Sequence, residues 1–407
     1  MNRLIPWAVL AGTLVASPAP ARVLVAGPSL ADTLKQAVDG DVVEVPKGTY
    51  AGSFVVDRRI TLRGKGAVLD GQGRGTVLRI EAAGAVVEGF SIQNGGTDLA
   101  APDSCVYLAE KATGAVLRKN VIEGCGFGVW VHRTDKARIL DNRVIGSLEG
   151  HRSNRGNGIQ LFDASHLLVE GNVVTGGRDG IYVSATDDSV IRKNSFEKTR
   201  YGVHYMYSYR NTLEGNESSD SFSGFALMGS RYIRAHHNTA SGNQEHGILL
   251  RDDQYCTIHD NVMEHDGVGL FVYSSTENRI FGNLMRGNEI GAKVWAGSVR
   301  NEVFDNEFVG NRSQVFYVSA EDLVWGKNGP GNYWGDYLGW DQDGDGFGDR
   351  PYRLDSFTAS LIHRFPAAVL LVRSPALELL SHLEQTLPIL RVPTIIDNRP
   401  RITRKQP

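Results

Sequence analysis

An asparagine recurs along most of the chain at intervals of 22 or 23 residues, with one interval of 30. The series is Asn120, Asn142, Asn172, Asn194, Asn216, Asn238, Asn261, Asn283 and Asn306. A glycine follows most of these asparagines eight residues later, as Gly128, Gly180 and Gly202 illustrate. Repeats of this length predict a solenoid, in which each repeat is one coil stacked on its neighbours.

Within each repeat, apolar and polar residues alternate. Val203 and Tyr205, for example, follow Gly202 and flank His204. This alternation predicts strands with one buried face, and the repeats show no helical periodicity. The sequence therefore predicts an all-β fold, a right-handed parallel β-helix of 22–23-residue coils. We expect each Asn to stack on its equivalents in adjacent coils, and each Gly to supply left-handed backbone geometry at a tight corner.

The ends of the chain differ from the repeats. Residues 1–21 resemble a signal peptide, because an apolar run ends in a small-x-small cleavage site, and they predict export of the mature chain. Residues 22–320 are expected to form the β-helix, with a short N-terminal capping helix that begins at Ser29. Residues 321–358 form a Gly- and Asp-rich capping segment, and residues 359–407 form a tail for partner docking.

The tail is predicted to contain a helix that starts at Ser374 and ends before Pro388. Leu377, Leu380 and Leu387 give this helix an apolar face that packs on the last coil or docks on a partner. The helix is too short and too charged to cross a membrane, so membrane association is expected only through a partner.

Charge and cysteine content exclude two classes of protein. The formal net charge of −3 provides no basic field for nucleic acid. Three cysteines, Cys105, Cys125 and Cys256, are too few for a disulfide framework, and the odd number leaves at least one unpaired. A bridge between Cys105 and Cys125 is one option that the sequence leaves open.

One strand carries a candidate copper site. If Val203 and Tyr205 point inward, His204 and Met206 point outward, and Met228 lies one coil beyond Met206. Adjacent strands lie about 4.8 Å apart and same-face residues about 6.5–7 Å apart, so three long side chains can converge on one ion. An imidazole and two thioethers form a soft ligand set suited to Cu(I). The alternative is that the methionines only pad an apolar patch.

Two histidines on another face are weaker copper candidates. His236 and His259 each lie two residues before an Asn of the series, which places them one coil apart. Imidazoles at this spacing can bind a metal, although such histidines are more often solvated surface residues.

An acidic segment near residue 345 predicts a structural calcium site. Asp341, Asp343, Asp345 and Asp349 occupy positions 1, 3, 5 and 9 of a calcium-loop pattern, with Gly346 at position 6. Position 12 is Tyr352 instead of the bidentate Glu, so the loop is not a complete EF-hand. The alternative is an acidic turn without an ion.

Two motifs give the chain a family resemblance. Residues 201–216 read YGVHYMYSYRNTLEGN, and residues 331–352 run from GNYWGD through DQDGDGFGDRPY. Together with the signal peptide and the coils, they resemble NosD, a family of periplasmic copper-processing accessory proteins. The resemblance covers nearly the whole mature chain.

The resemblance implies a binding and delivery protein without turnover of its own. Its implied partners are the permease and ATPase of an ABC transporter, a copper-chaperone lipoprotein, and apo nitrous-oxide reductase, whose copper–sulfide centre it helps to assemble. It supports copper at His204, Met206 and Met228, and it suggests that the segment from Leu377 to Leu387 meets the permease.

The main rival hypothesis is a secreted polysaccharide lyase or epimerase, because parallel β-helices commonly host such enzymes. Hydrolysis requires two carboxylates across a groove, and the outward positions of the repeats provide no such pair. An inserted loop at residues 147–157, with His151, Arg152 and Arg155, is a candidate source of a base or a carboxylate clamp; the alternative is a surface excursion that borders one side of the concave face.

Overall fold

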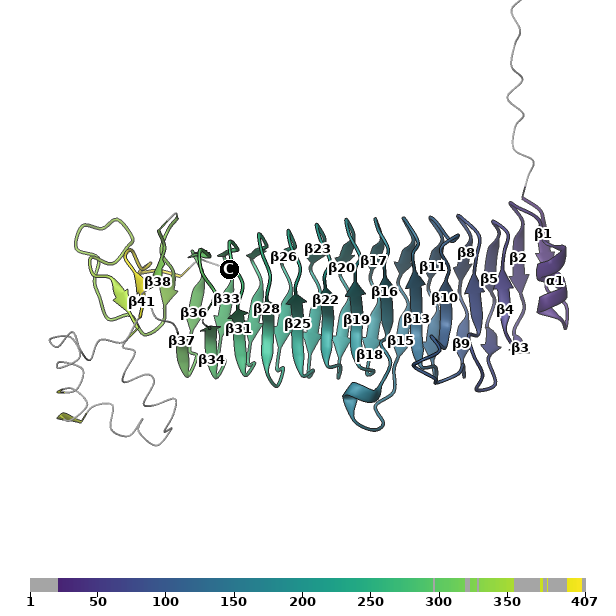
Figure 1. Cartoon of the computed structure of the whole chain (residues 1–407), viewed down its shortest axis with the longest axis horizontal. Helices are drawn as coiled ribbons and strands as arrows, with labels where there is room; N and C mark the ends of the chain where they lie inside the picture. Colours follow the sequence, from purple (N-terminus) through teal and green to yellow (C-terminus); the bar gives the residue numbers. More distant parts are fainter. Residues whose placement is uncertain are drawn as a thin grey trace, which may run out of the picture.

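The computed structural model describes residues 21–295, 297–318, 323–327, 329–354, 374–375, 379 and 394–404. These residues form an elongated parallel β-solenoid of the right-handed type (Figure 1). Sheet A has 13 strands, from β1 (Val23–Val25) to β35 (Glu302–Phe304), and sheet B has 13, from β3 (Gly48–Ala51) to β39 (Tyr333–Trp334). The prediction of a parallel β-helix is confirmed.

Sheet C is the third face and has 12 strands. They are β4 (Phe54–Val56), β7 (Leu78–Ile80), β10 (Ser104–Leu108), β13 (Phe127–His132), β16 (Ile159–Phe162), β19 (Asp179–Ser184), β22 (Tyr201–Met206), β25 (Ser223–Met228), β28 (His246–Arg251), β31 (Val268–Tyr273), β34 (Ile290–Val294) and β37 (Ser313–Tyr317). Each coil contributes a strand to sheets A, B and C in turn, and the inward side chains of all three form one apolar column.

The helix α1 (Leu30–Gln36) lies at the N-terminal end of the solenoid (Figure 1). Ser29 caps it by accepting a hydrogen bond from the Asp32 backbone N–H at 3.3 Å, as the capping-box pattern predicts. Leu30 and Leu34 are buried against the first coils. The predicted tail helix with Leu377, Leu380 and Leu387 falls outside the described residues. Across the described ranges, no helix has the length and apolar character needed to span a bilayer.

The repeating asparagines form a continuous hydrogen-bonded ladder inside the corner between sheets A and B. The Asn194 backbone N–H and side-chain amide both donate to Asn216 Oδ1, at 3.0 and 2.9 Å, and the same amide donates to the Val169 carbonyl at 3.0 Å. Lys193, directly before Asn194, adopts a left-handed conformation with φ of 53°. The prediction that the asparagines stack is confirmed.

The repeating glycines have a different role from the predicted one. Gly128, Gly180 and Gly202 lie within strands of sheet C and do not have positive φ angles. A Cβ at Gly180 would come within 2.4 Å of the Phe196 ring and 2.5 Å of the Gly202 carbonyl oxygen. The expectation of left-handed corners at these glycines was therefore wrong. Glycine is required because an interior side chain packs directly against the strand backbone.

The asparagine ladder ends on a carboxylate from the C-terminal part of the chain. Asn306 donates to Asn332 Oδ1 at 3.0 Å, and the Asn332 backbone N–H donates to Asp397 Oδ2 at 2.7 Å. Asp397 belongs to β41 (Ile395–Asp397), which pairs with β38 (Leu323–Trp325) and β40 (Tyr352–Arg353) in a small sheet. The chain therefore returns to the last coil after residue 393.

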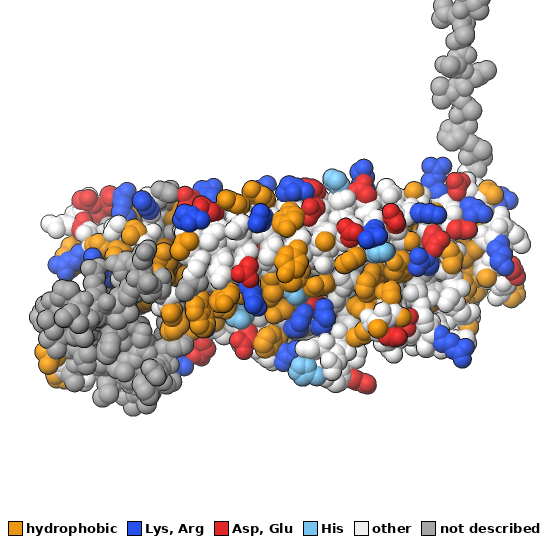
Figure 2. Space-filling view, in the orientation of Figure 1, with side chains coloured by type: hydrophobic (Ala, Val, Ile, Leu, Met, Phe, Trp, Pro, Cys, Tyr) orange, Lys and Arg blue, Asp and Glu red, His pale blue; other side chains and the backbone are white. Residues whose placement is uncertain are grey.

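A disulfide joins Cys105 to Cys125 in neighbouring coils, which settles the option that the sequence left open. Cys256 is free and buried, and burial raises the pKa of its thiol. The outer surface mixes apolar patches with Lys, Arg, Asp and Glu side chains, as the space-filling view shows (Figure 2).

A second buried ladder follows the corner between sheets B and C and contains one carboxylate. The Asn243 backbone donates to Asp266 Oδ1 at 2.7 Å, and the Asp266 backbone donates to Asn288 Oδ1 at 2.8 Å. Asp266 thus replaces an asparagine, and its Oδ2 atom is buried without a hydrogen-bond partner. Burial raises the pKa of Asp266 to about 7.

We expect Asp266→Asn to stabilise the protein at and above neutral pH. Because the folded-state pKa is raised, the carboxyl group lowers stability as pH rises from about 3.8 to about 7, by up to roughly 1.4 kcal/mol per pH unit. The variant lacks this loss, so its advantage in unfolding free energy should be small near pH 4 and should level off above pH 7. Urea denaturation across this range measures the difference. The exposed Asp220→Asn serves as control, and a pH-independent gain at Asp266 would contradict the assignment.

Candidate functional site

The three strands β19, β22 and β25 are neighbours at the middle of sheet C. Val203 and Tyr205 are fully buried in the apolar column, so His204 and Met206 lie on the outer face of β22. Met206 is paired in register with Met228 on β25, and both side chains are half-buried. The outward register predicted for this row is confirmed. Whether the row binds copper is a separate question.

His204 is enclosed although it belongs to an outward-facing row. Only 6% of the residue is exposed, and its ring lies 4.9 Å from the Tyr182 ring and 4.8 Å from the Tyr201 ring, measured between centroids. Its Nδ1 atom is 3.1 Å from Asp179 Oδ2. Its Nε2 atom is buried and has no hydrogen-bond partner. A buried ring nitrogen without a partner is costly for a protein, so this atom is a candidate contact for a water, an ion or a ligand.

Asp179 and Arg200 form an ion pair behind His204. Arg200 donates from Nε to Asp179 Oδ1 at 2.8 Å and from Nη2 to Oδ2 at 2.6 Å. Burial acts to raise the pKa of Asp179, but hydrogen bonds from His204 and Arg200 outweigh it and hold the pKa below its ordinary value. Asp179 is therefore a carboxylate that can accept a hydrogen bond from His204 Nδ1, although Arg200 Nη2 also lies 3.3 Å from the same nitrogen. The Nε2 atom keeps its lone pair, which is the arrangement seen in carboxylate–histidine–metal groups.

The sequence analysis did not identify Asp179 or Arg200. Asp179 lies one coil before Tyr201 and contacts His204 diagonally across two strands. One signal in the sequence could have pointed to Asp179. It is a charged residue directly before the repeating glycine of its coil, whereas the same position holds the uncharged Tyr201 and Ser223 in the next two coils.

The inserted loop extends along one edge of sheet C. It contains a short 3-10 helix, Arg152–Asn154. Arg152 lies over the Phe222 ring at 4.7 Å and donates a hydrogen bond to Gln244 Oε1 at 3.2 Å. Phe222 and Gln244 belong to the two coils that follow the coil of His204. The loop thus flanks the approach to the candidate site.

The histidines predicted on the other face are brought together but lie apart from His204. His236 and His259 are paired in register on sheet A, and their rings stack with centroids 4.9 Å apart. Burial of the ring, followed by the charge of His259, lowers the pKa of His236.

The acidic loop has a defined fold. Carboxylate oxygens of Asp341, Asp343 and Asp345 lie within 4.8 Å of one another, while Asp349 Oδ2 accepts a hydrogen bond from the Gln342 backbone at 2.7 Å. Tyr352, at the position of the missing Glu, is buried and stacks on Trp334 with centroids 4.0 Å apart. Calcium at this loop stays a prediction.

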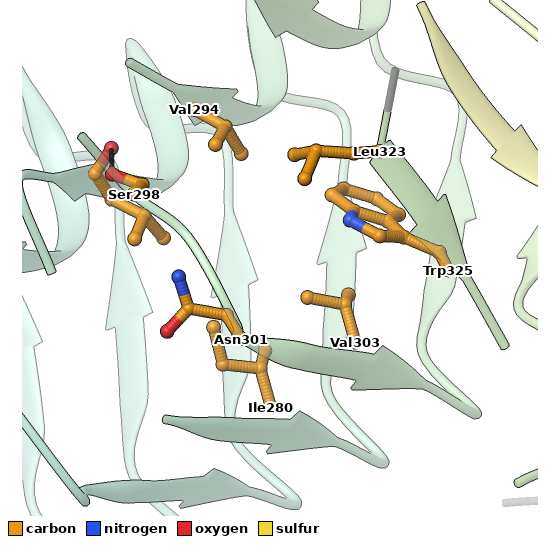
Figure 3. A pocket seen from close by; sticks show the side chains of 8 residues that line it. Ile280, Val294, Ser298, Asn301, Val303, Leu323 and Trp325 are labelled. Carbon is orange, nitrogen blue, oxygen red and sulfur yellow. Dashed lines mark hydrogen bonds between the residues drawn. The ribbon is translucent and has the colours of Figure 1, made fainter. Parts of the chain in front are cut away.

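A small apolar cavity lies in the column at the C-terminal coils (Figure 3). Val294, Val303, Leu323 and Trp325 line it together with Ser298 and Asn301, and Trp325 of β38 faces it from one side. Its lining contains no imidazole or sulfur, so it is unsuited to copper.

A family model and two curated relatives identify one family. A family model described as "Periplasmic copper-binding protein (NosD)" matches residues 143–339. A "Probable ABC transporter binding protein NosD" from Pseudomonas aeruginosa is 39% identical over 91% of this chain and 90% of that protein. A protein of the same description from Stutzerimonas stutzeri is 35% identical over 92% of this chain and 90% of the relative.

Solved structures share the architecture. The receptor-binding domain of the siphovirus 9NA tailspike has a TM-score of 0.53 at 10% identity, covering 82% of this chain and 79% of that one. The catalytic domain of a GH87 α-1,3-glucanase has a TM-score of 0.52 at 12% identity, covering 78% and 70%. At such identities the likeness shows the fold alone.

The geometry behind His204 predicts a fixed ring tautomer. In the metal-free protein we expect the His204 ring to carry its proton on Nδ1, because Nδ1 lies closer to the accepting Asp179 Oδ2, at 3.1 Å, than to the donating Arg200 Nη2, at 3.3 Å. Asp179→Asn should mix the tautomers, since an amide can accept or donate. Nitrogen-15 NMR of the imidazole distinguishes the two forms. Asp163→Asn, on an exposed pair with Arg133, is the matched control. A wild-type ring with its proton on Nε2 would contradict this account.

Proposed function

The chain belongs to the NosD family of periplasmic copper-binding proteins, and we propose that it carries copper for an ABC transporter that supports assembly of the copper–sulfide centre of nitrous-oxide reductase. In this proposal copper is cargo, and the protein has no turnover of its own. Its partners are the permease and ATPase of the transporter, a copper-chaperone lipoprotein and the apo reductase.

One observation carries the copper assignment. His204, whose buried Nε2 atom has no hydrogen-bond partner, lies on the outer face of sheet C, and the thioethers of Met206 and Met228 lie in register on the same face. Met206 follows His204 by two residues on one strand, and Met228 is the neighbour of Met206 on the next. Strand spacing places such side chains about 5–7 Å apart, within reach of a single ion. Two sulfurs and one neutral imidazole favour Cu(I) over harder ions.

The enclosure of His204 also suits a carrier. Tyr182 and Tyr201 cover the ring, so an ion held there is screened from water and from exchange with solvent ligands. Asp179 pairs with Arg200 and contacts His204 at Nδ1, which leaves Nε2 as the ring nitrogen that can bind a metal.

The same contacts argue against glycoside hydrolysis at this site. Asp179 is the carboxylate beside His204, and both of its oxygens are engaged by Arg200. Its lowered pKa makes it a poor proton donor, whereas glycoside cleavage needs one carboxyl group with a raised pKa and a second one facing it.

Anaerobic Cu(I) titration against a chromogenic competitor tests the site. The wild-type protein should bind one Cu(I) tightly. His204→Ala and the double variant Met206→Ala, Met228→Ala should each weaken binding by about 100-fold or more, since even a supporting partner is worth roughly 10–100-fold. The exposed His265→Ala is the control. Wild-type affinity in both variants would reject the site, and release of unsaturated uronates from alginate or pectin would support the enzyme hypothesis instead.

The docking element for the permease is proposed to be the segment between Leu354 and Thr394. Both of its flanks are anchored at the same place, because the Leu354 backbone donates to the Ile395 carbonyl at 3.1 Å. A truncation would remove Asp397 and the end of the asparagine ladder with it. Substitution within the segment is therefore the cleaner test.

We expect Leu377→Ser, Leu380→Ser and Leu387→Ser together to reduce capture of the protein by detergent-solubilised permease at least tenfold, because they remove the proposed apolar docking face. Leu338→Ser is a matched control, since Leu338 is 93% exposed on the neighbouring described segment. The thermal midpoint of the solenoid should stay unchanged in both proteins. Undiminished capture by the triple variant would remove this segment from the interface.

A further inference from the structure

A second group of metal-ligand side chains lies on the outer face of sheet A, at the corner that leads into the asparagine ladder. The strands β26 (Arg234–His236) and β29 (Thr257–His259) end there in His236 and His259. Each is followed by a corner residue in the left-handed conformation, His237 with φ of 55° and Asp260 with φ of 53°.

The left-handed corner explains why consecutive residues meet. Along a strand, neighbouring side chains point to opposite faces. The corner turns the second residue back, so His237 Nδ1 lies 2.9 Å from His236 Nδ1. In the next coil, Asp260 Oδ2 lies 2.8 Å from His259 Nδ1 in the same way. Two coils therefore present three imidazoles and one carboxylate as a compact block.

This block is confined to two coils. In the preceding coil, the residue paired with His236 is Glu214, and in the coil after His259 the paired residue is Phe281. The corner position of His237 is held by Gly215 and Gly282 in those coils. The clustering is thus a local feature and does not follow from the repeat.

The spacing of the two Nδ1 atoms fits a chelated ion. Two nitrogens that each lie about 2.0–2.1 Å from one ion are about 2.9 Å apart at the right angle of a square-planar Cu²⁺ site, and about 3.3–3.4 Å apart at the tetrahedral angle of a Zn²⁺ site. Without an ion, two neutral imidazole nitrogens make this contact only with a proton between them. Imidazole nitrogen with nearby carboxylate is a borderline ligand set that suits Zn²⁺ and Cu²⁺, and it contains no sulfur for Cu(I).

We propose that His236 and His237 chelate a divalent transition-metal ion, Zn²⁺ or Cu²⁺, through their Nδ1 atoms, with His259 as the third ligand. The His259 ring stacks on His236 with centroids 4.9 Å apart but lies 6.2 Å from His237. To join the ion, His259 turns about its side-chain bonds and gives up its 2.8 Å contact with Asp260. This site is independent of the proposed Cu(I) site on sheet C.

The test uses Zn²⁺ in calorimetric titration and Cu²⁺ in electron paramagnetic resonance, both on the purified protein. One Zn²⁺ should bind the wild type, and His236→Ala and His237→Ala should each weaken it at least tenfold. The Cu²⁺ spectrum should show coupling to at least two nitrogens, and His237→Ala should remove one. These half-exposed and exposed positions allow substitution without disturbing the core.

Two variants separate this site from other histidines. His166→Ala removes an exposed corner histidine that, like His259, pairs with an aspartate, at 2.7 Å from Asp135, and it should leave Zn²⁺ affinity unchanged. His204→Ala should also leave it unchanged, whatever it does to Cu(I). Wild-type affinity in His236→Ala and His237→Ala, or an equal loss in His166→Ala, would overturn the proposal.

Discussion

The asparagine ladder is the interaction on which the rest of this structure depends. Each asparagine accepts a hydrogen bond from a backbone N–H of the preceding coil and donates one to a carbonyl of that coil, so every corner between sheets A and B from Asn120 to Asn332 is held by buried hydrogen bonds. A slip of one residue would leave these groups unpaired along the whole column. The ladder therefore fixes the register of all three sheets, and with it which side chains of β22 and β26 reach the surface.

Because the ladder fixes the register, the asparagine repeat was enough to predict part of the structure. The asparagine period and the alternation around Val203 and Tyr205 were sufficient to predict the coils, the orientation of His204 and Met206, and the pairing of Met206 with Met228. Asp179 was missed because it contacts His204 diagonally between neighbouring strands, and the repeat period predicts only which residues lie directly opposite each other. Asp397 was missed because it meets Asn332 across 65 residues, outside the repeat.

The glycine error has a physical lesson. A repeated glycine signals either a left-handed backbone or a place without room for a Cβ, and sequence does not separate the two. In this chain, the left-handed corners are taken partly by other glycines, such as Gly215 and Gly282, and partly by non-glycine residues, such as Lys193, His237 and Asp260. This division of roles matters for function, because a histidine at such a corner can meet the histidine before it, which glycine could not do.

The two proposed metal positions differ in ways that follow from where the sheets place them. On sheet C, bulky rings and an ion pair bury an imidazole beside thioethers, which favours a soft ion shielded from water. On sheet A, the imidazoles lie on an open corner and suit a divalent ion in exchange with solvent. Because the ladder holds the sheets rigidly around a filled apolar column, an ion cannot pass between them through the protein. Any transfer between the two positions must proceed through solution or through a partner that contacts both faces.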